Sequence, residues 1–185
     1  VGCRRGIVRR DGGAFGQNNE DWYLRLNPMG KVPVLDDNGY VLWESNTIVR
    51  YLAAQYDRDE LYPQDPQVRG EAEKWMDWKL AFLQPAMFGA FWGLIRTPEA
   101  ERDGDAIQAS AEESARLFGI LDRHLQGRDY IAANHLTIGD IPVGASTYRW
   151  YGLEVEHPDY PALRAWYEKL THRQAFEDYV MIPIT

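Results

Sequence analysis

The sequence predicts an α+β protein in two parts, a short amino-terminal unit that contains strands and a longer unit made only of helices. Up to about Tyr56 the apolar runs are short and glycine is frequent, whereas beyond Pro66 apolar residues recur at helical spacing. Between these regions, residues 57–66 (DRDELYPQDP) are polar and include two prolines, as linkers do. The predicted domains are residues 1–58 and residues 66–185.

Composition and charge exclude several classes of partner. The formal net charge is −8 and the basic residues cluster only at Arg4, Arg5, Arg9 and Arg10, so the chain is a poor candidate for a nucleic-acid-binding protein. No apolar run approaches the roughly 20 residues that span a bilayer, and the start lacks the apolar stretch of a secretion signal. The single cysteine, Cys3, excludes an internal disulfide, and the four histidines lack the spacing of metal ligands. We therefore expect a cytoplasmic protein with no nucleic-acid, membrane or metal partner.

The first region has the pattern of a β-hairpin followed by a helix. Two apolar runs, residues 31–35 and 40–43, flank a polar segment, residues 36–39, whose Asn-Gly pair is a strong hairpin signal. Apolar residues then recur at helical spacing, and Ser45 or Asn46 suits the N-cap of that helix.

The second region has the pattern of a helical bundle. Helices are predicted at residues 68 to about 92, 100–125, from 137 onward, 161–170 and 173–179. Pro85 should bend or interrupt the first of them, because proline removes a backbone donor. The inner face of the second helix is predicted to consist of Ile107, Ala111, Ala115, Phe118, and Leu121 or Leu125.

The start of the third bundle helix is marked by a capping box. Thr137 and Asp140 are spaced so that each side chain can bond a backbone N–H of the first turn. Leu136 and Ile141 match the hydrophobic staple that accompanies such a cap. The motif predicts a helix start and carries no chemistry of its own.

Two dipeptides suggest a ligand site. Val32-Pro33 is either the mark of an edge strand or a cis-proline turn that exposes the backbone of Val32 to a ligand. Ser45 opens a helix, whose N-terminus attracts a carboxylate, and Glu44 can accept a hydrogen bond from an ammonium group. Such a corner suits an α-amino acid group, although the residues alone are equally consistent with plain capping.

The same residues match a known family. The segments 26–35 (LNPMGKVPVL) and 42–52 (LWESNTIVRYL) resemble the glutathione-binding half of the glutathione transferases. The segments 136–140 (LTIGD) and 160–166 (YPALRAW) are similar to parts of the helical half of that family. The resemblance, closest to bacterial members of theta or beta type, implies a thioredoxin-like amino-terminal domain followed by an all-helical domain.

The resemblance also implies roles for individual residues. The backbone of Val32 would pair with the cysteinyl part of glutathione, the co-substrate, with Pro33 cis. Glu44 and Ser45 would hold the γ-glutamyl end, and Lys31 would reach the glycyl carboxylate.

A hydrophobic electrophile would lie between the domains, against the first bundle helices, and receive the glutathione thiolate in a detoxification reaction. The aromatic residues near enough to contribute are Trp75, Trp78, Phe82, Phe88 and Trp92, for which core packing or a dimer face is the alternative interpretation. The family further implies a homodimer, built across the helix after Ser45 and the helix that contains Trp75.

The sequence departs from the family at its start. The family begins with a strand, a turn carrying the catalytic Ser, Tyr or Cys, a helix and a second strand, but only 30 residues precede Lys31 here. If residues 7–10 are the second strand, residues 1–6 are too few for the rest, so we expect the first strand and the catalytic corner to be lacking. A truncated gene model or protein, a native short chain, and a segment absent only from this sequence are the competing explanations.

This departure leaves the catalytic residue unassigned, since Cys3 falls at the wrong place for a nucleophile. We therefore expect the 185-residue chain to conjugate glutathione poorly. A noncatalytic binding or assembly module is the alternative, and another class of glutathione-dependent enzyme is a third hypothesis.

Overall fold

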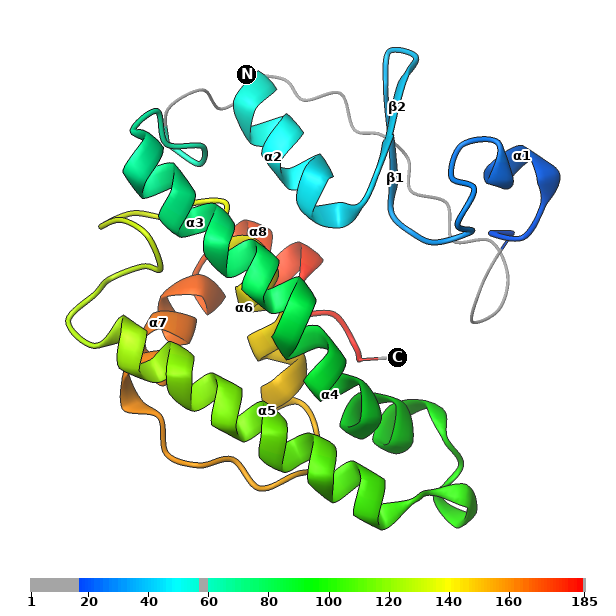
Figure 1. Ribbon diagram of the computed structural model, residues 1–185, viewed down its shortest axis with the longest axis vertical. Coiled ribbons are helices and arrows are strands. Elements are labelled where there is room, and N and C mark those ends of the chain that lie inside the picture. Colours follow the sequence, from blue (N-terminus) through cyan, green and yellow to red (C-terminus); the bar gives the residue numbers. More distant parts are fainter. Residues whose placement is uncertain (1–16, 57–59, 185) are drawn as a thin grey trace. The chain divides into compact units, whose positions relative to one another are not determined.

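A computed structural model describes residues 17–56 and 60–184 of the chain (Figure 1). The chain divides into two compact units, Val1–Tyr62 and Pro63–Thr185, with the boundary inside the polar segment 57–66. Strand residues 7–10 of the sequence prediction, and Cys3, lie outside the described residues. In the described residues the first unit mixes helices and strands and the second is all helical, as predicted.

The first unit is a hairpin with a helix on either side in the chain. Its elements are α1 (Asp21–Leu24), β1 (Val34–Asp37), β2 (Tyr40–Trp43) and α2 (Ser45–Tyr56). The two strands pair antiparallel, with Val34 opposite Trp43 and Asp37 opposite Tyr40.

The hairpin turn contains only Asn38 and Gly39, with φ angles of 55° and 92°. Two consecutive residues with positive φ form the tight turn that suits strand twist, and Asn-Gly adopts it readily. The predicted hairpin is therefore confirmed, but Asp36 and Asp37, predicted as turn, belong to β1, and β1 begins at Val34 rather than at Lys31.

A tyrosine pair ties α2 to the hairpin. The hydroxyls of Tyr51 and Tyr56 both donate to Oδ2 of Asp37, at 2.8 and 2.6 Å. The ring of Tyr51 also contacts that of Tyr40, with centroids 5.2 Å apart. Hydrogen bonds from Tyr56 and Tyr51 lower the pKa of Asp37, because they favour its ionised form.

The first helix of the bundle is continuous but changes its pitch twice. It runs through α3 (Pro66–Trp78), a π-helical turn η1 (Lys79–Leu83), α4 (Gln84–Phe91) and a second π-helical turn η2 (Trp92–Arg96). The predicted interruption at Pro85 takes the form of the first π turn, in which the N–H of Gln84 bonds the carbonyl of Lys79. A π turn contains one residue more than an α-helical turn, and it accommodates the hydrogen bond that is missing because proline has no backbone N–H.

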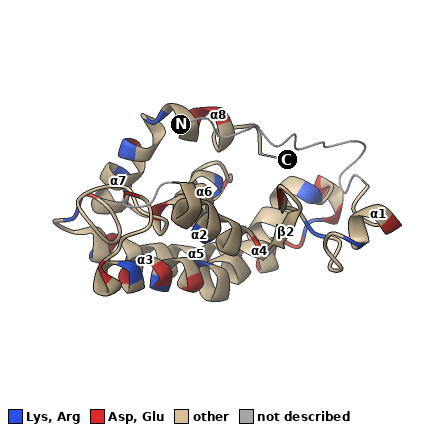
Figure 2. Ribbon diagram, turned by 90° about the horizontal axis from the view of Figure 1, so that it is seen from above, with Lys and Arg blue, Asp and Glu red and all other residues tan. Residues whose placement is uncertain are grey.

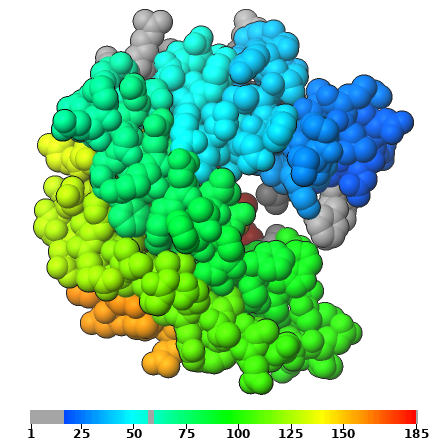
Figure 3. All heavy atoms as spheres, in the orientation of Figure 1, coloured from blue at the N-terminus to red at the C-terminus, as the bar shows by residue number. Residues whose placement is uncertain are grey.

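The remaining elements are η3 (Glu99–Glu101), α5 (Gly104–Leu125), α6 (Asp140–Tyr151), α7 (Pro161–Thr171) and α8 (Gln174–Tyr179). Helix α5 starts at Gly104 rather than at residue 100, because the side chain of Asp103 accepts from the N–H of Ala106 at 3.0 Å and caps the helix. Helices α4 and α5 lie side by side in the second unit (Figure 3).

The core of the second unit is formed by side chains from several helices, among them α4, α5, α6 and α7. The predicted inner face of α5 is confirmed, since Ala111, Phe118, Leu121 and Leu125 are buried, with Ile107 and Ala115 half-buried against them. Trp150 of α6 and Trp166 of α7 are also buried, and Phe118 stacks on Trp150 with ring centroids 5.3 Å apart. Each fully buried large apolar side chain stabilises the fold by about 1.5–3 kcal/mol.

The buried carboxylate of Asp140 joins three segments of the bundle. Its Oδ1 accepts from the N–H of Ile131 at 2.9 Å and from Nε1 of Trp166 at 2.8 Å. Its Oδ2 accepts from the backbone N–H and the hydroxyl of Thr137, at 2.8 and 3.0 Å. The capping box is thus half right: Asp140 bonds the backbone of Thr137, but the Thr137 hydroxyl bonds the carboxylate, and α6 begins at Asp140 rather than at Thr137.

The charged surface shows no segregation by sign along α3, where basic and acidic residues are interleaved (Figure 2). Among the residues that the structure describes, no helix is long and apolar enough to cross a bilayer.

Candidate functional site

The loop between α1 and β1 presents the backbone of Val32. The Val32-Pro33 peptide bond is cis, which confirms the cis-proline interpretation over a plain edge strand. Lys31, Val32 and Pro33 are all exposed, Val32 by 63%. Within residues 17–56 and 60–184, no hydrogen bond uses the N–H or the carbonyl of Val32. An extended ligand can therefore pair with this residue as a strand would.

The carbonyl just before Val32 is held from inside the unit. The hydroxyl of Tyr23 and Nδ2 of Asn27 both donate to the backbone oxygen of Lys31, at 2.8 and 2.7 Å. Oδ1 of Asn27 also accepts from the N–H of Met29 at 3.0 Å, and Asn27 is only 2% exposed. Neither Tyr23 nor Asn27 was predicted to belong to the site; the Asn27-Pro28 dipeptide, which favours turn initiation, is the one local signal for this loop.

Gly30 is required by the shape of the same loop. Its φ is +61°, and a Cβ placed there would lie 3.2 Å from the carbonyl oxygen of Asn18 and 3.3 Å from Oδ1 of Asn19. Its N–H bonds the carbonyl of Asn27 at 3.0 Å. Any other residue would meet both a strained backbone and close contacts, so the loop depends on glycine here.

The second part of the site is the start of α2. Glu44 adopts a left-handed conformation with φ 73°, and its carbonyl accepts from the N–H of Ile48 at 2.9 Å. Glu44 is therefore the N-cap residue, and the prediction of Ser45 or Asn46 at that position is wrong by one or two residues. A left-handed conformation costs a residue with a Cβ about 1–2 kcal/mol, and such strain is concentrated at functional sites.

Glu44 and Ser45 give this corner both signs of charge. Ser45 is the first residue of the 12-residue helix α2, whose first N–H groups and dipole attract an anion. Both side chains are exposed, and no hydrogen bond within the described residues engages the carboxylate of Glu44 or the hydroxyl of Ser45. The arrangement can hold a carboxylate at the helix start and an ammonium group at Glu44.

The hairpin register brings the two parts together. Val34 is paired with Trp43, so Pro33 and Glu44 follow at the same open end of the hairpin, away from the Asn38-Gly39 turn (Figure 1). The five predicted site residues, Lys31, Val32, Pro33, Glu44 and Ser45, therefore share one end of the first unit.

The aromatic residues of the first bundle helix divide into two groups. Trp75 is buried and Trp78 packs against the core, so core packing is the correct interpretation for these two. Phe82, Phe88 and Trp92 are exposed, and Phe88 stacks on Trp92 with ring centroids 5.4 Å apart. An apolar, aromatic surface is thus available on η1, α4 and η2.

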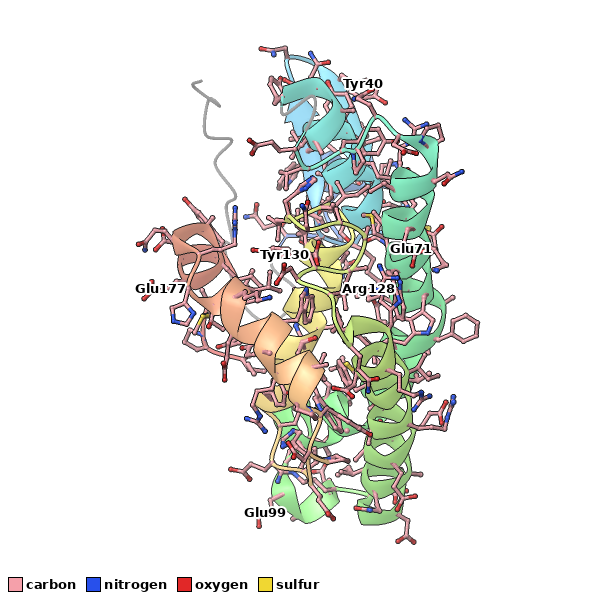
Figure 4. The ribbon with its side chains drawn as sticks, turned by 90° about the vertical axis from the view of Figure 1, so that its left-hand side faces the viewer. Tyr40, Glu71, Glu99, Arg128, Tyr130 and Glu177 are labelled. Atoms are coloured by element: carbon pink, nitrogen blue, oxygen red, sulfur yellow. The ribbon has the colours of Figure 1, made fainter. Side chains whose placement is uncertain are left out.

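His124, at the end of α5, has structural partners within the bundle. Nε2 of His124 lies 2.8 Å from the carbonyl of Ile131, its ring contacts Trp75, and Glu71 lies 3.7 Å away. Figure 4 labels Glu71 on α3 and Arg128 just after α5, two of the charged groups that act on this histidine. Burial lowers the pKa of His124, and among the described residues no three His, Cys, Asp or Glu side chains are grouped to hold a metal.

Lys79, in the first π turn, is a second group of the bundle whose pKa is shifted. Its Nζ donates to Oε1 of Gln84 at 2.6 Å. Burial, and then the charge of Arg149, lowers the pKa of Lys79 to about 8.

The sequence is similar to those of known proteins over both units. Two family models match the chain: the glutathione S-transferase N-terminal domain over residues 8–54 and the glutathione S-transferase C-terminal domain over residues 83–174. Over 176 residues the chain is 42% identical to glutathione S-transferase GstB of Escherichia coli (strain K12), covering 94% of this chain and 85% of the relative. Over 168 residues it is 29% identical to glutathione S-transferase theta-1 of Mus musculus, covering 84% and 67%.

Solved structures agree with these matches. The theta class glutathione S-transferase from Xanthomonas axonopodis pv. citri, with glutathione bound, superposes with a TM-score of 0.90 at 45% identity, covering 94% of this chain and 84% of the other. The fold class predicted from the sequence, a thioredoxin-like amino-terminal domain followed by an all-helical domain, is confirmed. The chain belongs to the glutathione S-transferase family.

Proposed function

We propose that this protein is a transferase that conjugates glutathione, its co-substrate, to an electrophilic small molecule. The observation that carries the proposal is the corner at the open end of the hairpin, where the backbone of Val32, to which no described residue bonds, lies near a helix start preceded by an acid. The related Xanthomonas structure, with glutathione bound, supports glutathione as the occupant.

Each part of the tripeptide has a matching group in this corner. The γ-glutamyl carboxylate lies at the start of α2 with the Ser45 hydroxyl, and its ammonium group bonds Glu44. The cysteinyl residue pairs with the backbone of Val32, and the glycyl carboxylate lies near Lys31. The exposure of all these groups in the described structure supports the assignment.

The reaction is a displacement or addition by sulfur. The glutathione thiol loses its proton to solvent or a base, and the thiolate forms a bond to the electrophilic carbon, where a leaving group departs or a double bond takes up the electron pair. An enzyme of this kind must lower the pKa of the bound thiol, which is about 8.5 for a free cysteine. No described residue is assigned that role, so poor conjugation by the 185-residue chain alone stays a prediction.

The electrophile is hydrophobic in this proposal, because Phe82, Phe88 and Trp92 offer it exposed aromatic surface on the first bundle helix. The first domain, residues 1–58, binds glutathione, and the second, residues 66–185, supplies the apolar surface. We further propose a cytoplasmic homodimer that uses α2 and α3, and a role in detoxification. Sedimentation at micromolar concentration tests the oligomeric state, and a monomer would contradict it.

Binding of glutathione to purified wild-type protein, measured by calorimetry, tests the proposal directly. Ser45→Ala should weaken glutathione by about 1–3 kcal/mol, because a hydrogen bond to a charged group is lost. Thr47→Ala, an exposed change two residues after Ser45 in the same helix turn, is the matched control and should bind like wild type. Absence of binding to wild-type protein at millimolar glutathione would contradict the proposal.

A panel of electrophiles then separates an enzyme from a binding module. Conjugation of any of them above the uncatalysed rate supports a transferase. Tight glutathione binding without conjugation would favour a noncatalytic binding or assembly module instead.

A further inference from the structure

We infer that Tyr23 and Asn27 are positioning residues for glutathione, which aim the N–H of Val32 at the ligand by holding the carbonyl of Lys31. This inference rests on the proposed function and deepens it. Neither residue touches the ligand in this proposal; both act through the backbone.

The geometry follows from one peptide group. The carbonyl of Lys31 and the N–H of Val32 belong to the same planar peptide, so in its trans form they point in opposite directions. Tyr23 and Asn27 pull the carbonyl toward themselves, with donor–acceptor distances of 2.8 and 2.7 Å. The N–H of Val32 must then point away from these two side chains, toward the side on which no described residue bonds it.

The two donors also fix the orientation of the Lys31 carbonyl. A carbonyl oxygen has two lone pairs, and Tyr23 and Asn27 occupy both, so the Lys31 oxygen cannot rotate outward to compete for a ligand donor. Asn27 is 2% exposed and Tyr23 is 9% exposed, so water does not readily replace either donor. The peptide is therefore set before the ligand arrives, and binding does not have to order it.

The two hydrogen bonds of the Asn27 side chain, one accepted from Met29 and one donated to Lys31, can be separated by mutation. Asn27→Asp keeps an oxygen to accept from the N–H of Met29, but it places a second carboxylate oxygen where Nδ2 donates to Lys31. Two acceptors then face each other, and the Lys31 carbonyl is pushed from its position. We expect this variant to raise the dissociation constant of glutathione about tenfold or more.

Tyr23→Phe removes the other donor and leaves the ring in place. It should raise the dissociation constant roughly three- to tenfold, the size of one net hydrogen bond. The matched control is Tyr51→Phe, which removes a phenol hydroxyl that also donates at 2.8 Å in the same unit, but to Asp37 near the hairpin turn. Tyr51→Phe should lower the melting temperature and leave glutathione affinity within twofold of wild type.

The experiment measures the dissociation constants of glutathione and S-methylglutathione, by calorimetry at a temperature where every variant is folded by circular dichroism. Both ligands should weaken by the same factor in Tyr23→Phe, because the Val32 contact does not involve the thiol. In any variant active enough to assay, KM for glutathione should rise while kcat at saturating glutathione stays within twofold.

The outcomes are distinct. If wild type binds glutathione and Tyr23→Phe and Asn27→Asp bind equally well, the positioning role is wrong and the proposed function stands. If Tyr51→Phe weakens binding as much as Tyr23→Phe, the effect is one of general stability, which also overturns the inference. If wild type itself does not bind, the proposed function fails. Should Asn27→Asp not fold, Tyr23→Phe and its control decide the matter alone.

Discussion

Replacing Glu44 by glycine should make the protein more stable and its glutathione site weaker. Glu44 has a φ of 73°, and this left-handed conformation costs a residue with a Cβ about 1–2 kcal/mol but costs glycine almost nothing. Glycine in turn loses more backbone entropy on folding, about 0.5–1 kcal/mol. The difference predicts a gain of about 0.5–1 kcal/mol in the free energy of unfolding for Glu44→Gly.

The same change removes the carboxylate proposed to hold the ligand ammonium group. A hydrogen bond to a charged group contributes about 1.5–3 kcal/mol, and the exposure of Glu44 places it at the lower end. Glutathione should therefore bind about tenfold more weakly. Glu44→Gln separates the two effects, because it keeps the strained backbone and removes only the charge: affinity should fall without any gain in stability.

Asn38 provides the matched control, since its φ of 55° is also left-handed and it lies in the hairpin turn, at the far end from the site. Asn38→Gly should change stability by less than Glu44→Gly, because asparagine tolerates this conformation, and should leave affinity unchanged. Urea unfolding gives the stability and calorimetry the affinity. A Glu44→Gly protein that is less stable than wild type and binds glutathione normally would refute both parts of the reasoning.

Three further predictions concern the bundle. Asp140→Ala should lower the free energy of unfolding by about 3 kcal/mol or more, measured in urea, because buried donors on Ile131, Thr137 and Trp166 lose their acceptor. Burial keeps the pKa of His124 below 6.5, so near that pH the unfolded chain binds a proton that the folded chain does not. The free energy of unfolding should therefore fall as the pH drops below 6.5. In urea unfolding from pH 7 to 5, His124→Gln should show a smaller fall than wild type. Burial lowers the pKa of Lys79 from 10.5 to about 8, so between these pH values the unfolded chain binds a proton that the folded chain does not, and wild-type stability should rise with pH. Lys79→Met should lack this rise and be more stable than wild type at pH 7 by about 1–3 kcal/mol. A Lys79→Met protein with the wild-type pH profile would contradict this.

The features that the sequence predicted well depend on residues close together in the chain. The hairpin follows from Asn38-Gly39, because both residues accept the positive φ that the turn needs. The inner face of α5 follows from a helical period that continues over 22 residues. The ligand roles of Val32 and Glu44 stay a prediction, which rests on two local signals, a proline and a helix start.

The features that it missed depend on contacts or on competing local bonds. The hydroxyl of Tyr23 reaches the Lys31 carbonyl eight residues away, and no local pattern encodes that approach. The side chains of Ser45 and Asn46 suit an N-cap, but the N-cap is Glu44, which has a left-handed backbone and whose carbonyl accepts the first helical hydrogen bond, from Ile48. The Thr137 hydroxyl, which suits a helix cap, instead donates to the buried carboxylate of Asp140 at 3.0 Å.

The π-helical turn at Lys79–Leu83 sets which residues of α4 face the core. Such a turn is an α-helix with one residue inserted, and each residue of an α-helix rotates the chain by about 100°. If the same residues wound as a regular α-helix instead, every residue after the turn would be rotated by about 100°, which would bring Ala86 into the place of buried Met87 and Gly89 into the place of Ala90, which is fully enclosed. The exposed Phe88–Trp92 stack therefore depends on an irregularity five residues upstream, and a chain without that extra residue would have to carry its aromatic surface at different positions of the sequence.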